Sequence, residues 1–132
     1  MSLGFESLLV AIGGALGAVV RLLFGKLGMA FGAGYMFGVP ILTTVVNVVG
    51  CFAAGMALAL LARQGMLESG MRSFLVVGFL GGFTTFSAFG VESLAVLHER
   101  GVRVFVFFVS INIFASLSAL AIGRYLGLGI RS

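Results

Sequence analysis

Four apolar stretches, each long enough to cross a lipid bilayer, account for most of this 132-residue chain. A membrane-spanning helix needs about 20 mainly apolar residues. The chain is 61% hydrophobic and 9% charged, with a mean hydropathy of +1.24, whereas about 25% of the residues in a soluble domain are charged. The sequence therefore predicts an all-α membrane protein, with residues 1–132 forming a single transmembrane domain. The four predicted spans run from Phe5 to Leu27, from Val39 to Ala62, from Ser73 to Leu97 and from Val104 to Leu128.

The third span contains a run that an uninterrupted membrane helix does not favour. Residues 81–90 read GGFTTFSAFG, with paired glycines and three hydroxyl side chains. In hydrocarbon every backbone N–H and C=O needs a partner, so a loosened helix persists only inside protein or beside a polar cavity. Ion pathways use such breaks, because freed carbonyls coordinate cations and helix N-termini face anions. We expect the third helix to be broken here and to handle ions.

Two aromatic residues of this run, Phe86 and Phe89, are three positions apart and share one helical face. Thr85 and Ser87 flank the first ring. Two interpretations are open for the pair: it lines an ion path, or it is ordinary core packing of an apolar helix.

Polar side chains also interrupt the second and fourth spans. Asn47 carries an amide that lipid cannot satisfy, with Thr43 one turn before it. Asn112 and Ser116 are four residues apart, so they share one face of the fourth span. These faces either line a pathway or form interhelical hydrogen bonds that hold the helices together.

Arg21 and Glu92 are the ionisable residues placed deepest in the spans, and such residues are functional candidates by default. Arg21 either reaches the membrane interface or lines a positively charged vestibule. Glu92 follows Phe89 by nearly one helical turn, and it either pairs with a basic residue or stands at the mouth of a path. For both residues, anchoring and pathway roles are open.

Basic residues are balanced between the two sides of the predicted four-span topology. An excess of Lys and Arg on the cytoplasmic side normally fixes orientation, and no excess exists here. We therefore expect dual topology and an antiparallel homodimer; the alternative is a fixed orientation set by a partner or by unequal weighting of the loops. The counted residues are Arg63, Arg72 and Arg131 on one side, and Lys26, Arg100 and Arg103 on the other.

Small residues recur at helical spacing in the first two spans. Gly13 and Gly17 form a GxxxG pattern, and Gly50 with Ala54 repeats that spacing in the second span. Such patterns let helix backbones approach closely. Either packing within one chain or the seam of a dimer accounts for them.

Catalysis has little support in the sequence, so we expect no enzyme. His98 is the only histidine and lies in a charged turn, and Cys51 is the only cysteine, which excludes a disulfide within one chain. No nucleophile-elbow, zinc-protease or phosphate-loop motif occurs. The basic residues form no stripe of the kind that binds nucleic acid, so lipid headgroups and an anionic solute are the expected partners.

Three segments together resemble the small fluoride channels of the Fluc or CrcB family. They are GGALGAVVR ending at Arg21, NVVG beginning at Asn47, and GGFTTFSAF followed by the Val-Glu pair at Glu92. The resemblance covers nearly the whole chain, and the central motif is highly specific. It implies a four-span protein that forms an antiparallel dual-topology homodimer with two fluoride pathways. It also implies a structural sodium ion at the dimer centre.

Position by position, the resemblance implies that Gly81 and Thr84 offer backbone carbonyls to sodium. Phe86 and Phe89 correspond to the family's pore phenylalanines, and Asn47 to its asparagine beside the path.

Ser87 and Ser116 resemble members of the family's hydroxyl-bearing track, while Arg21 and Glu92 resemble residues nearer the vestibules. Ala88, Gly90 and Leu120 depart from the residues common in the family, and Asn112 is a candidate to compensate for the missing hydroxyl groups.

The resemblance leads us to expect a passive channel that exports cytoplasmic fluoride across the plasma membrane and so confers fluoride resistance. Fluoride is small and holds its water tightly, so a pore must replace that water with close donors such as amides, hydroxyls and aromatic ring edges. The main alternative is a small proton-coupled multidrug antiporter, for which Glu92 would be the intramembrane carboxylate. A structural membrane subunit without transport would leave the hydroxyl and phenylalanine cluster unexplained.

Overall fold

The computed structural model describes residues 2–129, and four of its helical segments are long and apolar enough to cross a membrane. They are Leu3–Ala30, Ile41–Arg63, Gly70–Arg100 and Val102–Gly129. The prediction of an all-α, four-span membrane protein is confirmed. Arg131, counted above for topology, lies outside the described residues. The elements in chain order are α1 (Leu3–Ala30), β1 (Tyr35–Met36), β2 (Val39–Pro40), α2 (Ile41–Arg63), α3 (Gly70–Arg72), the π-helical segment η1 (Ser73–Leu80), α4 (Gly81–Phe83), α5 (Ser87–Arg100) and α6 (Val102–Gly129).

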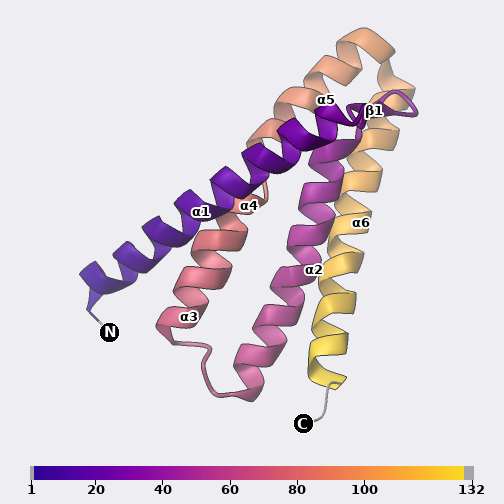
Figure 1. Ribbon diagram of the computed structural model, residues 1–132. Coiled ribbons are helices and arrows are strands. Elements are labelled where there is room, and N and C mark those ends of the chain that lie inside the picture. The colour runs from indigo at the N-terminus through magenta and orange to yellow at the C-terminus, as the bar shows by residue number, and fades with distance from the viewer. Residues whose placement is uncertain (1, 130–132) are drawn as a thin grey trace.

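The third span is broken, as predicted, and the other three are continuous. Helices α2 and α6 run side by side along their length, whereas α1 leans away from them and lies along η1 and α4 (Figure 1). The start of α1, the turn after α2 and the end of α6 lie at one end of the molecule (Figure 1). At that end Arg63 Nη1 donates a hydrogen bond of 3.1 Å to the Gly127 carbonyl, which ties α2 to α6.

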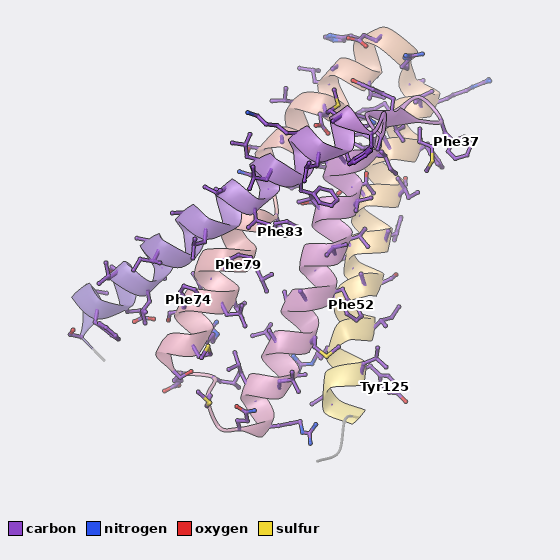
Figure 2. All side chains as sticks on the ribbon, viewed as in Figure 1. Phe37, Phe52, Phe74, Phe79, Phe83 and Tyr125 are labelled. Atoms are coloured by element: carbon purple, nitrogen blue, oxygen red, sulfur yellow. The ribbon has the colours of Figure 1, made fainter. Side chains whose placement is uncertain are left out.

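The glycines of α1 pack against the third span of the same chain. A Cβ atom on Gly13 would lie 2.9 Å from the Phe79 amide nitrogen, and one on Gly17 would lie 2.8 Å from the Phe83 amide nitrogen. Real Cβ atoms do not approach so closely, so no larger residue fits without a shift of backbone. Of the two interpretations of the GxxxG pattern, packing within one chain accounts for these glycines. Figure 2 shows Phe79 and Phe83 along the third span, where their stacked rings lie 6.4 Å apart.

Two local features were not predicted. The glycine-rich bend between the first two spans holds a short antiparallel hairpin, in which Tyr35 pairs with Pro40 and Met36 with Val39. Its two turn residues, Phe37 and Gly38, have φ angles of 54° and 80°. Positive φ at both central residues fits the twist of a two-residue hairpin. The other feature is η1, which replaces the first part of the expected α-helix.

The apolar core holds α5 against α6 beside the break. Phe108 of α6 is completely buried, and it clusters with Val39, Phe89 and Val96. This cluster anchors the second half of the broken span. The break is thus held between rigid elements on both sides.

Candidate functional site

The break spans three residues between α4 and α5. Helix α4 ends at Phe83, and Thr84 turns the backbone to an extended conformation with ψ at 162°. Helix α5 begins again at Ser87. A backbone at this depth needs partners other than the usual helical ones, because lipid supplies none.

Asn47 of α2 supplies those partners to Thr85. The Thr85 amide donates a hydrogen bond of 2.9 Å to Asn47 Oδ1, and Asn47 Nδ2 donates one of 3.0 Å to the Thr85 carbonyl. One side-chain amide therefore pairs with both backbone groups of one residue, as a neighbouring strand would. Asn47, predicted from the sequence as a path residue, holds the backbone at the break.

The hydrogen bonds continue from Asn47 into α6. Asn47 Nδ2 donates its second hydrogen bond, of 3.1 Å, to Asn112 Oδ1, and Asn112 Nδ2 donates one of 3.0 Å to Thr44 Oγ1. Thr44 in turn donates to the Pro40 carbonyl at 3.4 Å. Since an amide nitrogen carries two hydrogens, those of Asn47 are both used, and Asn112 keeps one. The two asparagines thus form hydrogen bonds that hold the helices together, and Asn112 also retains one N–H of its side-chain amide as a donor.

A threonine side chain accepts a hydrogen bond from the first turn of α5. The Ala88 amide donates a hydrogen bond of 3.2 Å to Thr85 Oγ1. A side-chain oxygen that accepts from the amide three residues later is the contact seen at helix N-caps, and here Thr85 makes it one residue before the N-cap residue Phe86. Thr85 was not among the predicted site residues. Its signal in the sequence is a threonine two residues before a helical run that begins at Ser87, directly after the glycine pair and Phe83-Thr84.

The break releases the two carbonyls that the resemblance assigns to a cation. In a continuous helix the Gly81 carbonyl would accept from the Thr85 amide, and the Thr84 carbonyl from the Ala88 amide. Both amides instead bond to side-chain oxygens, as described above. Gly81 and Thr84 border a cavity of about 160 Å³, here called the break cavity, which Gly50 and Cys51 also line. Arg21 Nη1 approaches the Thr84 carbonyl at 3.4 Å, a long hydrogen bond.

A second cavity, of about 290 Å³, lies between α2, the break and α6, and is here called the path cavity. None of its lining residues carries a carboxylate, ammonium, guanidinium or imidazole group. Ser116 Oγ is buried there without a hydrogen-bond partner among the described residues. Five of the six predicted path residues line this cavity, and Ser87 does not. The full lining consists of Asn47, Cys51, Thr84, Thr85, Phe86, Phe89, Asn112, Ile113, Ser116 and Leu117.

The two phenylalanines in this wall differ sharply in exposure. Phe86 is 81% exposed at the start of α5, whereas Phe89 is 6% exposed. Their ring centroids lie 5.6 Å apart at an angle of 57°, and the Phe89 and Phe108 rings lie 5.4 Å apart at 54°. Tilted pairs of this kind are favoured by the ring quadrupole. Phe89 therefore belongs both to the core and to the cavity wall.

Ser87 lies outside the path cavity. It is exposed, and its Oγ is 3.5 Å from Thr85 Oγ1. Its hydroxyl is thus near the break, on the outer surface of the single chain.

A third cavity, of about 550 Å³, lies between α1, α2 and the start of α5, and Arg21, Lys26 and Thr43 line it. The Thr43 hydroxyl donates a hydrogen bond of 2.8 Å to Glu92 Oε1, so the partner found for Glu92 is a threonine and not a basic residue. The other carboxylate oxygen of Glu92 is buried without a hydrogen-bond partner among residues 2–129. Arg21 therefore lies between this cavity and the break. Glu92 contacts Thr43 of the cavity wall but does not line the cavity itself.

Comparison with known proteins assigns the chain to a family. A family model described as CrcB-like protein, Camphor Resistance (CrcB), matches residues 8–124. A protein of Methylobacillus flagellatus named "Fluoride-specific ion channel FluC" is 35% identical over 119 residues, which cover 90% of this chain and 91% of that protein. Proteins of the same name from Rhizobium etli (strain CIAT 652) and Chelativorans sp. (strain BNC1) are each 39% identical, over 92% and 96% of this chain and 98% of their own length. Its fold, its broken third span and these matches show that the chain is a multi-pass membrane protein of the CrcB-like family.

Proposed function

We propose that this protein is a fluoride-selective channel that lets fluoride leave the cytoplasm passively across the plasma membrane. The observation that carries the proposal is the path cavity, which is lined by neutral donors and phenylalanine rings and lies beside a break in a membrane-spanning helix. Relatives that match over most of the chain are named as fluoride-specific ion channels. The protein is a transporter and not an enzyme.

The chemistry of the path cavity suits a small, strongly hydrated anion. The remaining Asn112 side-chain N–H and the Ser116 hydroxyl, which have no nitrogen or oxygen acceptor within residues 2–129, are neutral donors, and the Phe86 and Phe89 rings offer partly positive edges. A fixed cation inside the cavity would hold fluoride too firmly for conduction, which requires that an ion leave as readily as it enters. Arg21 lies outside this cavity, where its charge attracts anions without trapping them. Fluoride that enters as HF and dissociates in a less acidic cytoplasm then leaves down its gradient.

The proton-coupled antiporter that the sequence left open is not supported. An antiporter needs a titratable carboxylate in the chamber that holds its substrate, and Glu92 is absent from the wall of the path cavity. The relatives found carry the name of a channel.

Fluoride efflux from proteoliposomes tests the proposed function. Vesicles loaded with potassium fluoride and given a potassium ionophore should release fluoride promptly, because the channel then completes the electrical circuit. Vesicles loaded with chloride are the control and should release little. Equal release of both anions, or uptake of cationic dyes driven by a proton gradient, would contradict a fluoride channel.

We propose further that the working unit is an antiparallel homodimer. The large exposed ring of Phe86 at the edge of the path cavity supports this, because a second copy would cover it and close the path. The balanced basic residues support insertion in both orientations. Adding two or three lysines to the turn after α2 should lock one orientation and abolish transport. Co-expression with a copy locked the other way should restore transport, and full activity from one locked orientation would rule out the antiparallel dimer.

We also propose that a sodium ion is held where the two breaks meet. Two observations support such an ion: Gly81 and Thr84 border the break cavity, and their carbonyls have lost their helical donors. The ion would replace the long contact of 3.4 Å that the Thr84 carbonyl makes with Arg21. Carbonyl oxygen suits a hard cation, and two carbonyls from each chain would hold it. Replacing sodium by a large organic cation during purification should lower dimer stability, measured by size-exclusion chromatography. Unchanged dimer stability and transport without sodium would count against the ion.

A further inference from the structure

Cys51 is the single thiol of the chain, and it lies in the wall of the path cavity. It follows Asn47 by one helical turn on α2, so both side chains share the face that meets the break and α6. The residue is only partly buried. It also borders the break cavity, so it lies between the candidate path and the carbonyls of Gly81 and Thr84.

A second observation in the same cavity points to a guest molecule. Ser116 is 8% exposed and lines the path cavity with its Oγ beside the Cys51 thiol, and this Oγ has no nitrogen or oxygen hydrogen-bond partner within residues 2–129. A buried hydroxyl left without a partner has lost its hydrogen bonds to water and gained none in return, which is unfavourable. A guest with a hydrogen-bond acceptor would satisfy this hydroxyl while it lies in the cavity with the thiol. The cavity, at about 290 Å³, has room for several atoms beyond one water molecule, which takes about 30 Å³ of liquid volume.

We propose that Cys51 is a covalent modification site for small, uncharged, thiol-directed reagents, and that the adduct obstructs the path cavity. The obstruction rests on the proposed function, whereas the reaction at Cys51 does not. Alkyl methanethiosulfonates are the matching class of reagent, because they are apolar enough to cross a mainly apolar wall. Their sulfonyl oxygens accept hydrogen bonds, which the Ser116 hydroxyl can donate.

The reaction is a thiol–disulfide exchange in which the reagent is the oxidant. The sulfur of Cys51 attacks the divalent sulfur of methyl methanethiosulfonate, a new S–S bond forms, and the bond between divalent sulfur and sulfonyl sulfur breaks. The thiol proton leaves with the released group as methanesulfinic acid. The product is a methyl disulfide on Cys51, which a dithiol reductant reverses.

The test combines intact-mass measurement with fluoride efflux, using the full-length protein in proteoliposomes. Methyl and benzyl methanethiosulfonate should each add one group per chain. The larger benzyl adduct should reduce fluoride efflux at least about tenfold and the methyl adduct less, because a constriction in a pore acts by size. Dithiothreitol should restore both the mass and the efflux.

Two variants serve as controls for the site. Cys51→Ala should gain no mass, and its own efflux should not change when reagent is added. Cys51→Ala combined with Gln64→Cys places the only thiol in the exposed turn after α2. That protein should gain the mass and keep its efflux.

The rate of labelling gives a readout that does not depend on transport. Ser116→Ala should slow the reaction at Cys51 several-fold, whereas Ser118→Ala, on the exposed side of α6, should leave the rate unchanged. No added mass on the folded protein, full labelling without loss of efflux, or equal inhibition of Cys51→Ala would each overturn the proposal. A protein that labels normally but carries no fluoride before treatment would instead overturn the proposed function.

Discussion

The broken third span is held on its two sides in opposite ways. Toward α1 it packs through a glycine seam, in which Gly13 and Gly17 lie against the backbone of η1 and α4. Toward α2 and α6 it is held by an amide seam, in which Asn47 bonds to both backbone groups of Thr85 and also to Asn112. The glycine seam excludes side chains altogether, whereas the amide seam depends on them.

This difference explains where the path cavity lies. Close backbone contact needs no donors and leaves no space, so the α1 side fixes the first half of the span rigidly. The amide seam satisfies the backbone released at Thr85 and leaves donors beside a cavity. The first half of this broken span is therefore fixed by backbone packing on α1, whereas the break has polar contacts with α2 and, through Arg21, with the later part of α1.

Asn47→Ala should have the largest effect. It leaves both backbone groups of Thr85 and the Oδ1 of Asn112 without their bonds, at a cost on the order of 4 kcal/mol in unfolding free energy. Titration with denaturant in detergent micelles, followed by circular dichroism, measures this. Ser118→Ala, on the exposed side of α6, should change stability by less than about 0.5 kcal/mol. Equal tolerance of both changes would remove the structural role of the amide seam.

Gly17→Ala should destabilise the protein by about 2 kcal/mol, because the added Cβ collides with the backbone near Phe83 and overpacking costs about 1–3 kcal/mol. The matched control is Gly25→Ala on the same helix, where an added Cβ meets nothing within 4 Å. That change should be neutral or stabilise the helix by up to about 1 kcal/mol. Denaturant titration compares the two proteins. Similar losses from both would mean that the glycine seam does not form.

Phe89→Met should lower fluoride efflux roughly tenfold, equivalent to about 1.4 kcal/mol, because an aliphatic chain has no positive ring edge. Phe108→Met is the matched control, since that ring is also buried and packs on Phe89 but does not line the path cavity. Both swaps should cost less than about 1.5 kcal/mol in stability. Efflux that falls equally in both variants would show that Phe89 only packs.

Phe86→Met should lower fluoride efflux as Phe89→Met does. It should cost still less stability, because the Phe86 ring is exposed in the single chain.

Ser116→Ala should give the smallest change, and in opposite directions for two measurements. Removing a buried hydroxyl that has no partner should leave stability unchanged or raise it by up to about 1 kcal/mol. Fluoride efflux should fall a few-fold, because the path cavity loses a donor. A loss of stability would show that the hydroxyl already has a structural partner, and unchanged efflux would place it outside the path.

Much of the fold and some of the site follow from the sequence. Mean hydropathy and segment length predict the four spans, because the thickness of the bilayer sets the length of a crossing helix. The glycine and hydroxyl residues of the third span predict the break, because local backbone preference is a property of neighbouring residues. Five of the six predicted path residues meet at one cavity, since helical spacing already places them on common faces.

The tertiary structure decided how each of those residues is used. Asn47 and Thr85 are 38 residues apart, and Asn47 and Asn112 are 65 apart, so their bonds depend on how three helices rotate and pack. The sequence predicted Asn47 as a path residue, but only the packed structure shows that both its hydrogens are used. The tertiary structure likewise packs Gly13 and Gly17 within the chain and pairs Glu92 with Thr43. It also places Cys51 at the border of two cavities. Composition and periodicity specify which faces are polar or small, whereas the pairing of those faces comes from long-range packing.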